Sequence, residues 1–67
     1  MLNFEVKDMT CGHCASTIKR AVNAVDAGAR VEIDLAARRV MVEPAQADAA
    51  ELLEAIQDAG YTPVTVQ

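Results

Sequence analysis

The sequence predicts an α+β fold in which a four-stranded antiparallel sheet carries two helices on one face. Four short segments alternate apolar with polar residues, as half-buried strands do, and two longer segments repeat apolar residues every three or four positions, as amphipathic helices do. The segments follow one another as strand, helix, strand, strand, helix, strand within 67 residues. Two such strand-helix-strand units form the ferredoxin-like βαββαβ sandwich, so residues 1–67 are expected to make a single domain.

The first half of the chain is predicted to contain a strand, a loop and a helix. Residues 2–7 alternate as a strand, and a loop from Asp8 to Gly12 follows. A helix is expected from about Gly12 or Cys14 to Val25, and Asp26-Ala27-Gly28 ends it. The apolar face of this helix consists of Ala15, Ile18, Val22 and Val25.

The second half is predicted to contain two strands, a helix and a last strand. Segments 31–35 and 39–43 alternate on either side of a turn at 36–38. Asp48 and Glu51 have the spacing of a capping box at the start of the second helix, and Gly60 suits its end. Residues 61–66 form a last short strand, in which Pro63 indicates a sheet edge because proline cannot donate a backbone hydrogen bond.

The composition excludes some classes of function. The formal net charge is -4 and the sequence pI is about 4.6, which argues against binding to nucleic acid or to an anionic membrane surface. No apolar run approaches the length of a membrane helix. Since residues 2–7 already have the pattern of a strand, no signal peptide is visible, and a cytoplasmic location is expected.

The stretch Met9-Thr10-Cys11-Gly12-His13-Cys14 is compatible with two kinds of chemistry. Cys-Gly-His-Cys would suit a small thiol-disulfide oxidoreductase, in which one thiolate attacks a disulfide. A thioredoxin fold needs on the order of 100 residues, however, and Thr10 stands where such enzymes usually have an aromatic residue. The redox interpretation is therefore the weaker one.

The same two cysteines suit a soft metal ion. Cys11 lies in the predicted loop and Cys14 near the first helical turn, where backbone N–H groups and the helix dipole favour thiolate. Two cysteines and one histidine cannot close the four-ligand shell of structural zinc. Cu(I) accepts two thiolates; Ag(I) and Hg(II) share this preference. Zn(II) or Cd(II), with Asp8 or a water as an extra ligand, is a weaker alternative.

One pattern extends over nearly the whole chain. It consists of Met9-Thr10-Cys11-Gly12-His13-Cys14 after the first strand, Ile33-Asp34-Leu35 at the end of the second, Val40 and Val42 in the third, and Asp58-Ala59-Gly60-Tyr61 after the second helix. In this element order, the pattern resembles the heavy-metal-associated domain, the family of bacterial copper chaperones and of the N-terminal modules of copper-exporting P-type ATPases.

The resemblance implies a cytosolic copper chaperone that is not an enzyme. It would bind Cu(I) through Cys11 and Cys14 and pass it by thiolate exchange to a CxxC domain of a copper-transporting P-type ATPase. The alternatives are a metal-binding module of such an ATPase or a carrier of another soft metal. A start at Met1 and an end soon after the last strand favour the free-standing carrier.

Two departures from the family pattern are visible. Asp8 stands where the family usually has glycine, which could stiffen the loop or add negative charge beside the site. Segment 26–30 lacks the common Pro-Gly-Val form, which concerns the turn more than the function.

Five residues around the cysteines are candidates for a supporting role. Met9 is expected to pack in the core and tether the loop, with thioether ligation as the alternative. His13 could be a third ligand, a positive neighbour of the thiols, or an exposed loop residue. Thr10 and Gly12 are expected to serve the backbone conformation. Tyr61, from the start of the last strand, is expected to shield the site.

The charges are unevenly placed along the chain. Lys7, Lys19 and Arg20 lie in or near the first strand and helix, whereas Asp48, Glu51, Glu54 and Asp58 lie on the second helix. These are either ordinary solvated faces or a surface that steers a partner domain. The metal-free protein is expected to be a monomer, and an exposed CxxC could let two molecules share copper as a homodimer.

Overall fold

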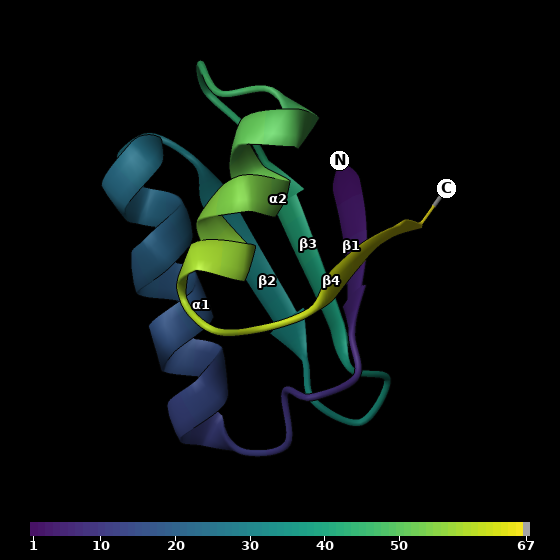
Figure 1. Ribbon diagram of the computed structural model, residues 1–67. Coiled ribbons are helices and arrows are strands. Elements are labelled where there is room, and N and C mark those ends of the chain that lie inside the picture. The colour runs from purple at the N-terminus through teal and green to yellow at the C-terminus, as the bar shows by residue number, and fades with distance from the viewer. Residues whose placement is uncertain (67) are drawn as a thin grey trace.

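The structure is a computed structural model that describes residues 1–66 (Figure 1). Its elements are β1 (Leu2–Val6), α1 (Gly12–Val25), β2 (Arg30–Asp34), β3 (Arg39–Glu43), α2 (Ala49–Asp58) and β4 (Pro63–Val66). The strands form one antiparallel sheet in the order β2-β3-β1-β4, and both helices cover the same face. The predicted ferredoxin-like sandwich is confirmed. Neither helix of the described chain is long and apolar enough to cross a bilayer.

The core lies between the helix pair and the sheet, as the sequence alternation requires. In β1, Phe4 and Val6 face inward and are fully buried, and Val40 and Val42 do the same in β3. The pairing of Phe4 with Val40 sets these side chains at the same level of the sheet. The fully buried side chains are Phe4, Val6, Met9, Ile18, Val22, Val40, Val42, Leu52 and Ile56.

The two ends of α2 have the caps that the sequence predicts. The Asp48 side chain accepts a hydrogen bond from the Glu51 N–H at 2.9 Å, and the Glu51 carboxylate accepts one from the Asp48 N–H at 3.4 Å. At the other end Gly60 has a φ of 99°, a left-handed conformation that glycine adopts without steric cost. Pro63 lies in β4 at the edge of the sheet, also as predicted.

The structure differs from the prediction at the boundaries of three strands and in the burial of one residue. Strand β1 ends at Val6, one residue earlier than predicted. Strand β2 begins at Arg30 and ends at Asp34, so Leu35 lies in the following turn and is 41% exposed. Val25 continues the apolar stripe of α1 but is 51% exposed, because the chain turns away at Asp26 and no following turn covers it. Strand β4 begins at Pro63, since Tyr61 belongs to the end structure of α2.

Asp26 fastens the end of α1 to the loop between β3 and α2. Its Oδ2 accepts backbone hydrogen bonds from Ala45 and Gln46 at 2.9 Å each and from Ala47 at 3.0 Å. These bonds, that from Gln46 foremost, hold the pKa of the buried Asp26 carboxyl below its ordinary value of 3.8. Next to it, a Cβ on Gly28 would lie 2.9 Å from the Ala45 Cβ, so the close approach of the two loops also requires glycine.

We predict that Asp26→Asn lowers the melting temperature at pH 7 by at least about 5 °C, because a neutral amide oxygen is a weaker acceptor than a carboxylate. The folded-state pKa is depressed, so the stabilisation is present above the unfolded value near 3.8 and is lost as pH falls through the folded value. Thermal unfolding followed by circular dichroism should show wild type and variant converging below pH 4. Glu32→Gln, on an exposed carboxylate of β2, is the charge-matched control. A difference that is independent of pH would contradict the role of the charge.

Candidate metal centre

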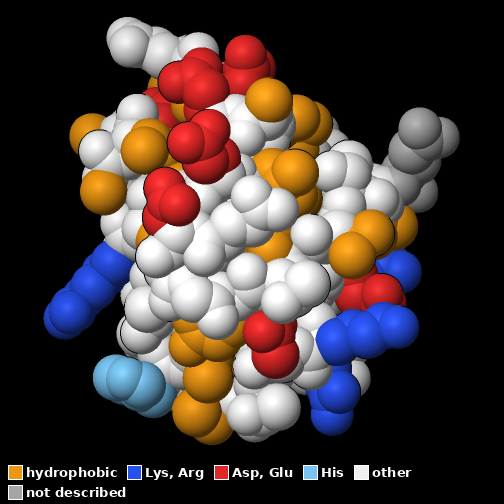
Figure 2. Space-filling view, viewed as in Figure 1, with side chains coloured by type: hydrophobic (Ala, Val, Ile, Leu, Met, Phe, Trp, Pro, Cys, Tyr) orange, Lys and Arg blue, Asp and Glu red, His pale blue; other side chains and the backbone are white. Residues whose placement is uncertain are grey.

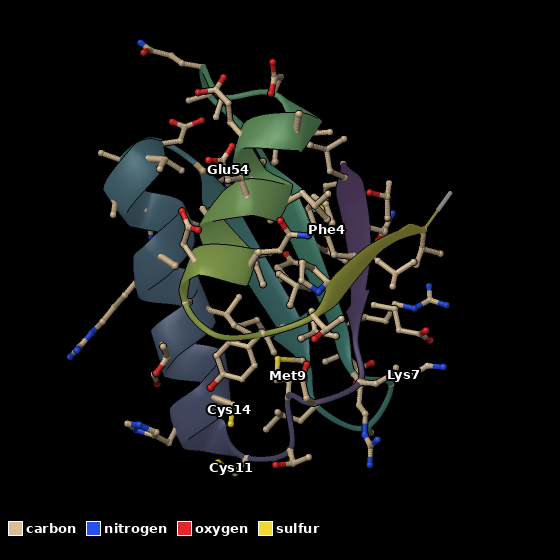
Figure 3. The ribbon with its side chains drawn as sticks, in the orientation of Figure 1. Phe4, Lys7, Met9, Cys11, Cys14 and Glu54 are labelled. Atoms are coloured by element: carbon tan, nitrogen blue, oxygen red, sulfur yellow. The ribbon has the colours of Figure 1, made fainter. Side chains whose placement is uncertain are left out.

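The two cysteines are held at the N-terminus of α1. Cys11 is the N-cap residue, with extended backbone, and its carbonyl accepts the first helical hydrogen bond from Ala15 N–H at 3.2 Å. Its side chain makes no capping hydrogen bond. Cys14 lies in the first turn, and the two Sγ atoms are 3.5 Å apart. Cys11 is exposed and Cys14 is half-buried, so the pair is accessible from one side (Figure 3).

The surroundings of Cys14 lower the pKa of its thiol. The Tyr61 hydroxyl is the largest cause, followed by the backbone N–H of Thr10 and the Cys11 thiol, and together they lower the pKa of Cys14 from 9.0 to about 7. About half of Cys14 is therefore thiolate at neutral pH, the form that binds metal. Thr10 acts here through its backbone.

Tyr61 is aimed at the cysteines by the end structure of α2. Gly60 N–H donates to the Gln57 carbonyl at 2.9 Å and Tyr61 N–H donates to the Ile56 carbonyl at 3.4 Å, which is the Schellman arrangement. The half-buried ring packs against the core. Its interaction with Cys14, then burial, raises the pKa of Tyr61, so the hydroxyl keeps its proton and can donate it in a hydrogen bond to a thiolate.

Met9 lies in the core of the protein. Its side chain is fully buried, and its N–H donates to the Val6 carbonyl at 3.1 Å as the chain leaves β1. Figure 3 shows the thioether pointing inward, away from the surface on which Cys11 lies. This position fits the expected packing role and leaves the loop tethered immediately before the cysteines.

The loop of residues 7–11, which leads to the dithiol and is called the metal loop below, is braced by two side chains whose contacts the sequence did not reveal. Arg38 Nη1 donates to the Lys7 carbonyl at 3.1 Å, and Asp8 Oδ1 accepts a hydrogen bond from Thr62 N–H at 3.2 Å. Arg38 has a φ of 54°, an uncommon conformation outside glycine and a sign of a constrained turn. One indication of these contacts was visible in the sequence, which is the presence of Asp8 where the family usually has glycine.

The residues between and beside the cysteines add no further ligand. In the described part of the chain, no group of three or more His, Cys, Asp or Glu side chains is placed to hold a metal ion, so neither His13 nor Asp8 completes a site with the thiols. His13 is exposed in the first turn of α1. Gly12 occupies an ordinary helical position with open space around it, so the expectation that it supplies an unusual conformation is wrong.

The sulfur spacing suits a bent two-thiolate site. With metal–sulfur bonds of about 2.3 Å, the observed 3.5 Å between sulfurs corresponds to a sulfur–metal–sulfur angle of about 100°. A linear arrangement would need about 4.6 Å, which the exposed Cys11 side chain could reach by rotating about its own bonds. The side of the pair that faces solvent stays open to a third donor.

Acidic side chains gather over α2. Figure 2 shows carboxylates clustered over this helix, whereas acidic, basic and apolar side chains are mixed at the opposite end of the view. The exposed carboxylates of this part of the chain are Asp48, Glu51, Glu54 and Asp58. The surface of α1 is basic by contrast, through Lys19 and Arg20.

A ferredoxin-like sandwich with a dithiol at the start of its first helix defines a class of small soft-metal-binding domains. The model of the heavy-metal-associated domain matches residues 3–62, and the chain belongs to this family.

The relatives of this chain include small proteins of similar length and a much longer transport ATPase. The chain is 41% identical over 63 residues to the COP-associated protein of Helicobacter felis, covering 90% of this chain and 92% of the relative. It is 33% identical over 60 residues to the copper chaperone CopZ of Enterococcus hirae, covering 87% of each. It is 36% identical over 62 residues to copper-transporting ATPase 2 of Rhizobium meliloti, covering 91% of this chain and only 8% of the ATPase.

Solved structures agree with this assignment. A gold-binding protein superimposes with a TM-score of 0.92 at 41% identity, covering 98% of this chain and all of that one. The copper chaperone Atx1 from Synechocystis, in a trimeric copper form carrying a His61Tyr substitution, superimposes with a TM-score of 0.91 at 31% identity, covering 96% of this chain and all of that one.

We predict that Tyr61→Phe raises the pKa of Cys14 from about 7 toward 9.0, because the ring is kept and only the hydroxyl is lost. The thiolate fraction at pH 7 should fall several-fold. Site-resolved mass spectrometry of alkylation by iodoacetamide between pH 5 and 10 measures this directly on the metal-free protein. An unchanged alkylation profile at Cys14 would mean that the Thr10 N–H and the Cys11 groups stabilise the thiolate without Tyr61.

Proposed function

We propose that this domain is a cytoplasmic copper chaperone that binds Cu(I) through Cys11 and Cys14 and delivers it to a copper-transporting P-type ATPase by thiolate exchange. The observation that carries the proposal is the pair of sulfurs 3.5 Å apart on an accessible loop, one of them with a pKa near 7. The domain binds and releases its cargo and catalyses no bond chemistry.

The donor set favours a soft monovalent ion. Thiolates select soft metals, and a site with two protein ligands leaves zinc short of its four-coordinate shell. Two thiolates on Cu(I) carry a net charge of minus one. The outward-pointing N–H groups and the positive end of the α1 dipole stabilise that excess charge. Relatives named as copper chaperones and as a copper-transporting ATPase support copper over other soft ions.

The open side of the site supports transfer by ligand exchange. A thiolate of the receiving CxxC domain would add to bound Cu(I) on the solvent side and give a three-coordinate copper. The exposed Cys11 would leave first, and the half-buried Cys14 would follow as the second partner thiolate binds. Each step breaks one copper–sulfur bond after another has formed, so copper is never released to solvent.

The runner-up functions share the same site. The match to a short segment of an ATPase supports a metal-binding module of such a transporter, and similarity to a gold-binding protein supports other soft ions as cargo. The oxidoreductase interpretation has the acidic Cys14 in its favour, but its thioredoxin fold is not the one observed. A metal-free monomer and a copper-bridged homodimer remain predictions.

We predict that the reduced protein binds one Cu(I) in anaerobic competition with a bicinchoninate-type chelator, and that Cys11→Ser and Cys14→Ser each weaken binding by more than about 100-fold. Met9→Leu and His13→Ala should keep stoichiometric binding, since Met9 is buried and His13 is outside the dithiol site. Tighter binding of Zn(II) than of Cu(I) would refute the proposal. Disulfide exchange without metal binding would favour the redox function.

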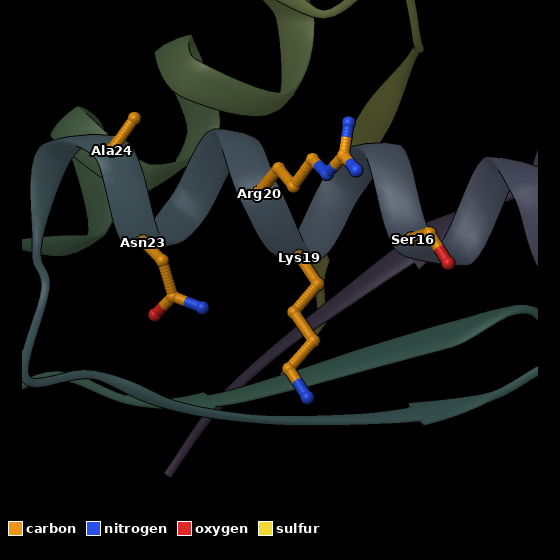
Figure 4. Close-up of a pocket in the computed structure, with 5 residues that line it drawn as sticks. All are labelled: Ser16, Lys19, Arg20, Asn23 and Ala24. Atoms are coloured by element: carbon orange, nitrogen blue, oxygen red, sulfur yellow. The ribbon is translucent and has the colours of Figure 1, made fainter.

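The basic surface of α1 gives a second prediction. Lys19 and Arg20 extend from α1 beside Ser16, Asn23 and Ala24, which line a shallow groove (Figure 4). Replacing Lys19 and Arg20 by Glu should slow Cu(I) transfer to an ATPase CxxC domain about tenfold at low salt, with the difference shrinking as salt is added.

Stopped-flow transfer kinetics at several ionic strengths would measure this effect. Arg30→Glu with Arg39→Glu, on the sheet, changes the net charge by the same amount and is the control. Equal slowing in both double variants would mean that total charge, and not the α1 surface, steers the partner.

A further inference from the structure

We propose that Asp8 is a positioning residue that holds Tyr61 over the dithiol and thereby limits how fast the bound metal is exchanged. This inference rests on the proposed metal-carrying function and adds a control on its rate. The structural basis is a hydrogen bond between two segments that are 54 residues apart in sequence.

The hydrogen bond joins the metal loop to the segment that carries Tyr61. Asp8 Oδ1 accepts from Thr62 N–H at 3.2 Å, and Thr62 directly follows Tyr61. Among the hydrogen bonds of residues 1–66, it is the one bond that joins segment 7–11 to segment 60–62. The pairing of β1 with β4 begins only at Val6 and Pro63. Asp8 therefore connects the loop before the cysteines to the segment that carries Tyr61, outside the paired part of the sheet.

Tyr61 is restrained from both directions along the chain. On its N-terminal side, its own N–H bonds to the Ile56 carbonyl at 3.4 Å, near the long limit for such a bond. On its C-terminal side, the bond from Thr62 N–H to Asp8 fixes the next peptide group. Without Asp8, that side would be held only from Pro63 onward, and the Tyr61 side chain would have more freedom to swing.

The loop on which Asp8 stands is itself held. The Arg38 guanidinium donates to the Lys7 carbonyl at 3.1 Å, and the Val6 N–H donates to the Arg38 carbonyl at 2.8 Å. On the other side of Asp8, the Met9 side chain is fully buried. A carboxylate between two such anchors is a well-placed acceptor, so its bond restrains the Thr62 peptide group.

The consequence for exchange follows from where Tyr61 lies. Its hydroxyl interacts with Cys14, the half-buried member of the pair, so the ring closes that side of the site and leaves the Cys11 side for an incoming thiolate. Releasing Thr62 would let the ring move and open a second approach. Loss of one hydrogen bond of this kind corresponds to a change of about three- to tenfold.

The test measures Cu(I) removal by excess bidentate thiol chelator from the stoichiometrically loaded wild type and its variants. Asp8→Ala should exchange about three- to tenfold faster than wild type, whereas Asp8→Asn, whose amide oxygen can still accept from Thr62, should stay near wild type. Glu32→Ala, which removes the same charge at the far edge of the sheet, is the control. In a Tyr61→Ala background, Asp8→Ala should have no further effect, because the restrained ring is gone.

Hydrogen exchange of the Thr62 amide in the metal-free proteins reports the bond itself: protection should be lost in Asp8→Ala and kept in Asp8→Asn. Stoichiometric copper binding with equal exchange rates in wild type and Asp8→Ala would overturn the inference and leave the carrier function intact. Equal acceleration in Asp8→Asn and Asp8→Ala would also overturn it, since charge would then be the cause. Failure of wild type to bind copper would instead refute the proposed function.

Discussion

Burial of Met9 is the constraint on which the metal site depends. Removing this side chain from water contributes about 1.5 to 3 kcal/mol, and it fixes the chain between the end of β1 and the start of α1. Because the anchor precedes Cys11 by two residues, the dithiol emerges at the surface while its backbone is held by the core. The dithiol is thus accessible without being loosely placed, which suits the rapid ligand exchange of the proposed carrier.

The other contacts divide between stabilising the sandwich and shaping the site. Asp26 ties the end of α1 to the loop before α2, through three backbone donors on one buried carboxylate oxygen. Asp8 performs a similar closure at the metal loop with a single, exposed bond. The difference in burial fits the proposed function. The buried contact ties α1 to the loop before α2, and the exposed one lies where metal exchange would require movement.

The parts of this structure that sequence could predict are those with local causes. Alternation, helical spacing and the capping box of Asp48 and Glu51 identified every element, and the Cys11 and Cys14 spacing identified the dithiol. The braces from Asp8, Arg38 and Asp26 could not be predicted, because their partners are 19 to 54 residues away and meet only in the folded chain. Asp26 did carry one physical signal: a carboxylate at a helix C-terminus opposes the dipole, so another interaction has to stabilise it.

The unequal environments of the two cysteines suit a carrier better than a symmetric pair would. Cys14, near pKa 7 and half-buried beside Tyr61, can hold a soft ion as thiolate while Cys11 rotates into solvent. In the proposed transfer, an incoming thiolate would displace the exposed ligand first, and the ion would stay bound through the sheltered one. Were both sulfurs buried, a partner could not add before a bond broke. Were both exposed, nothing on the protein would give the exchange a direction.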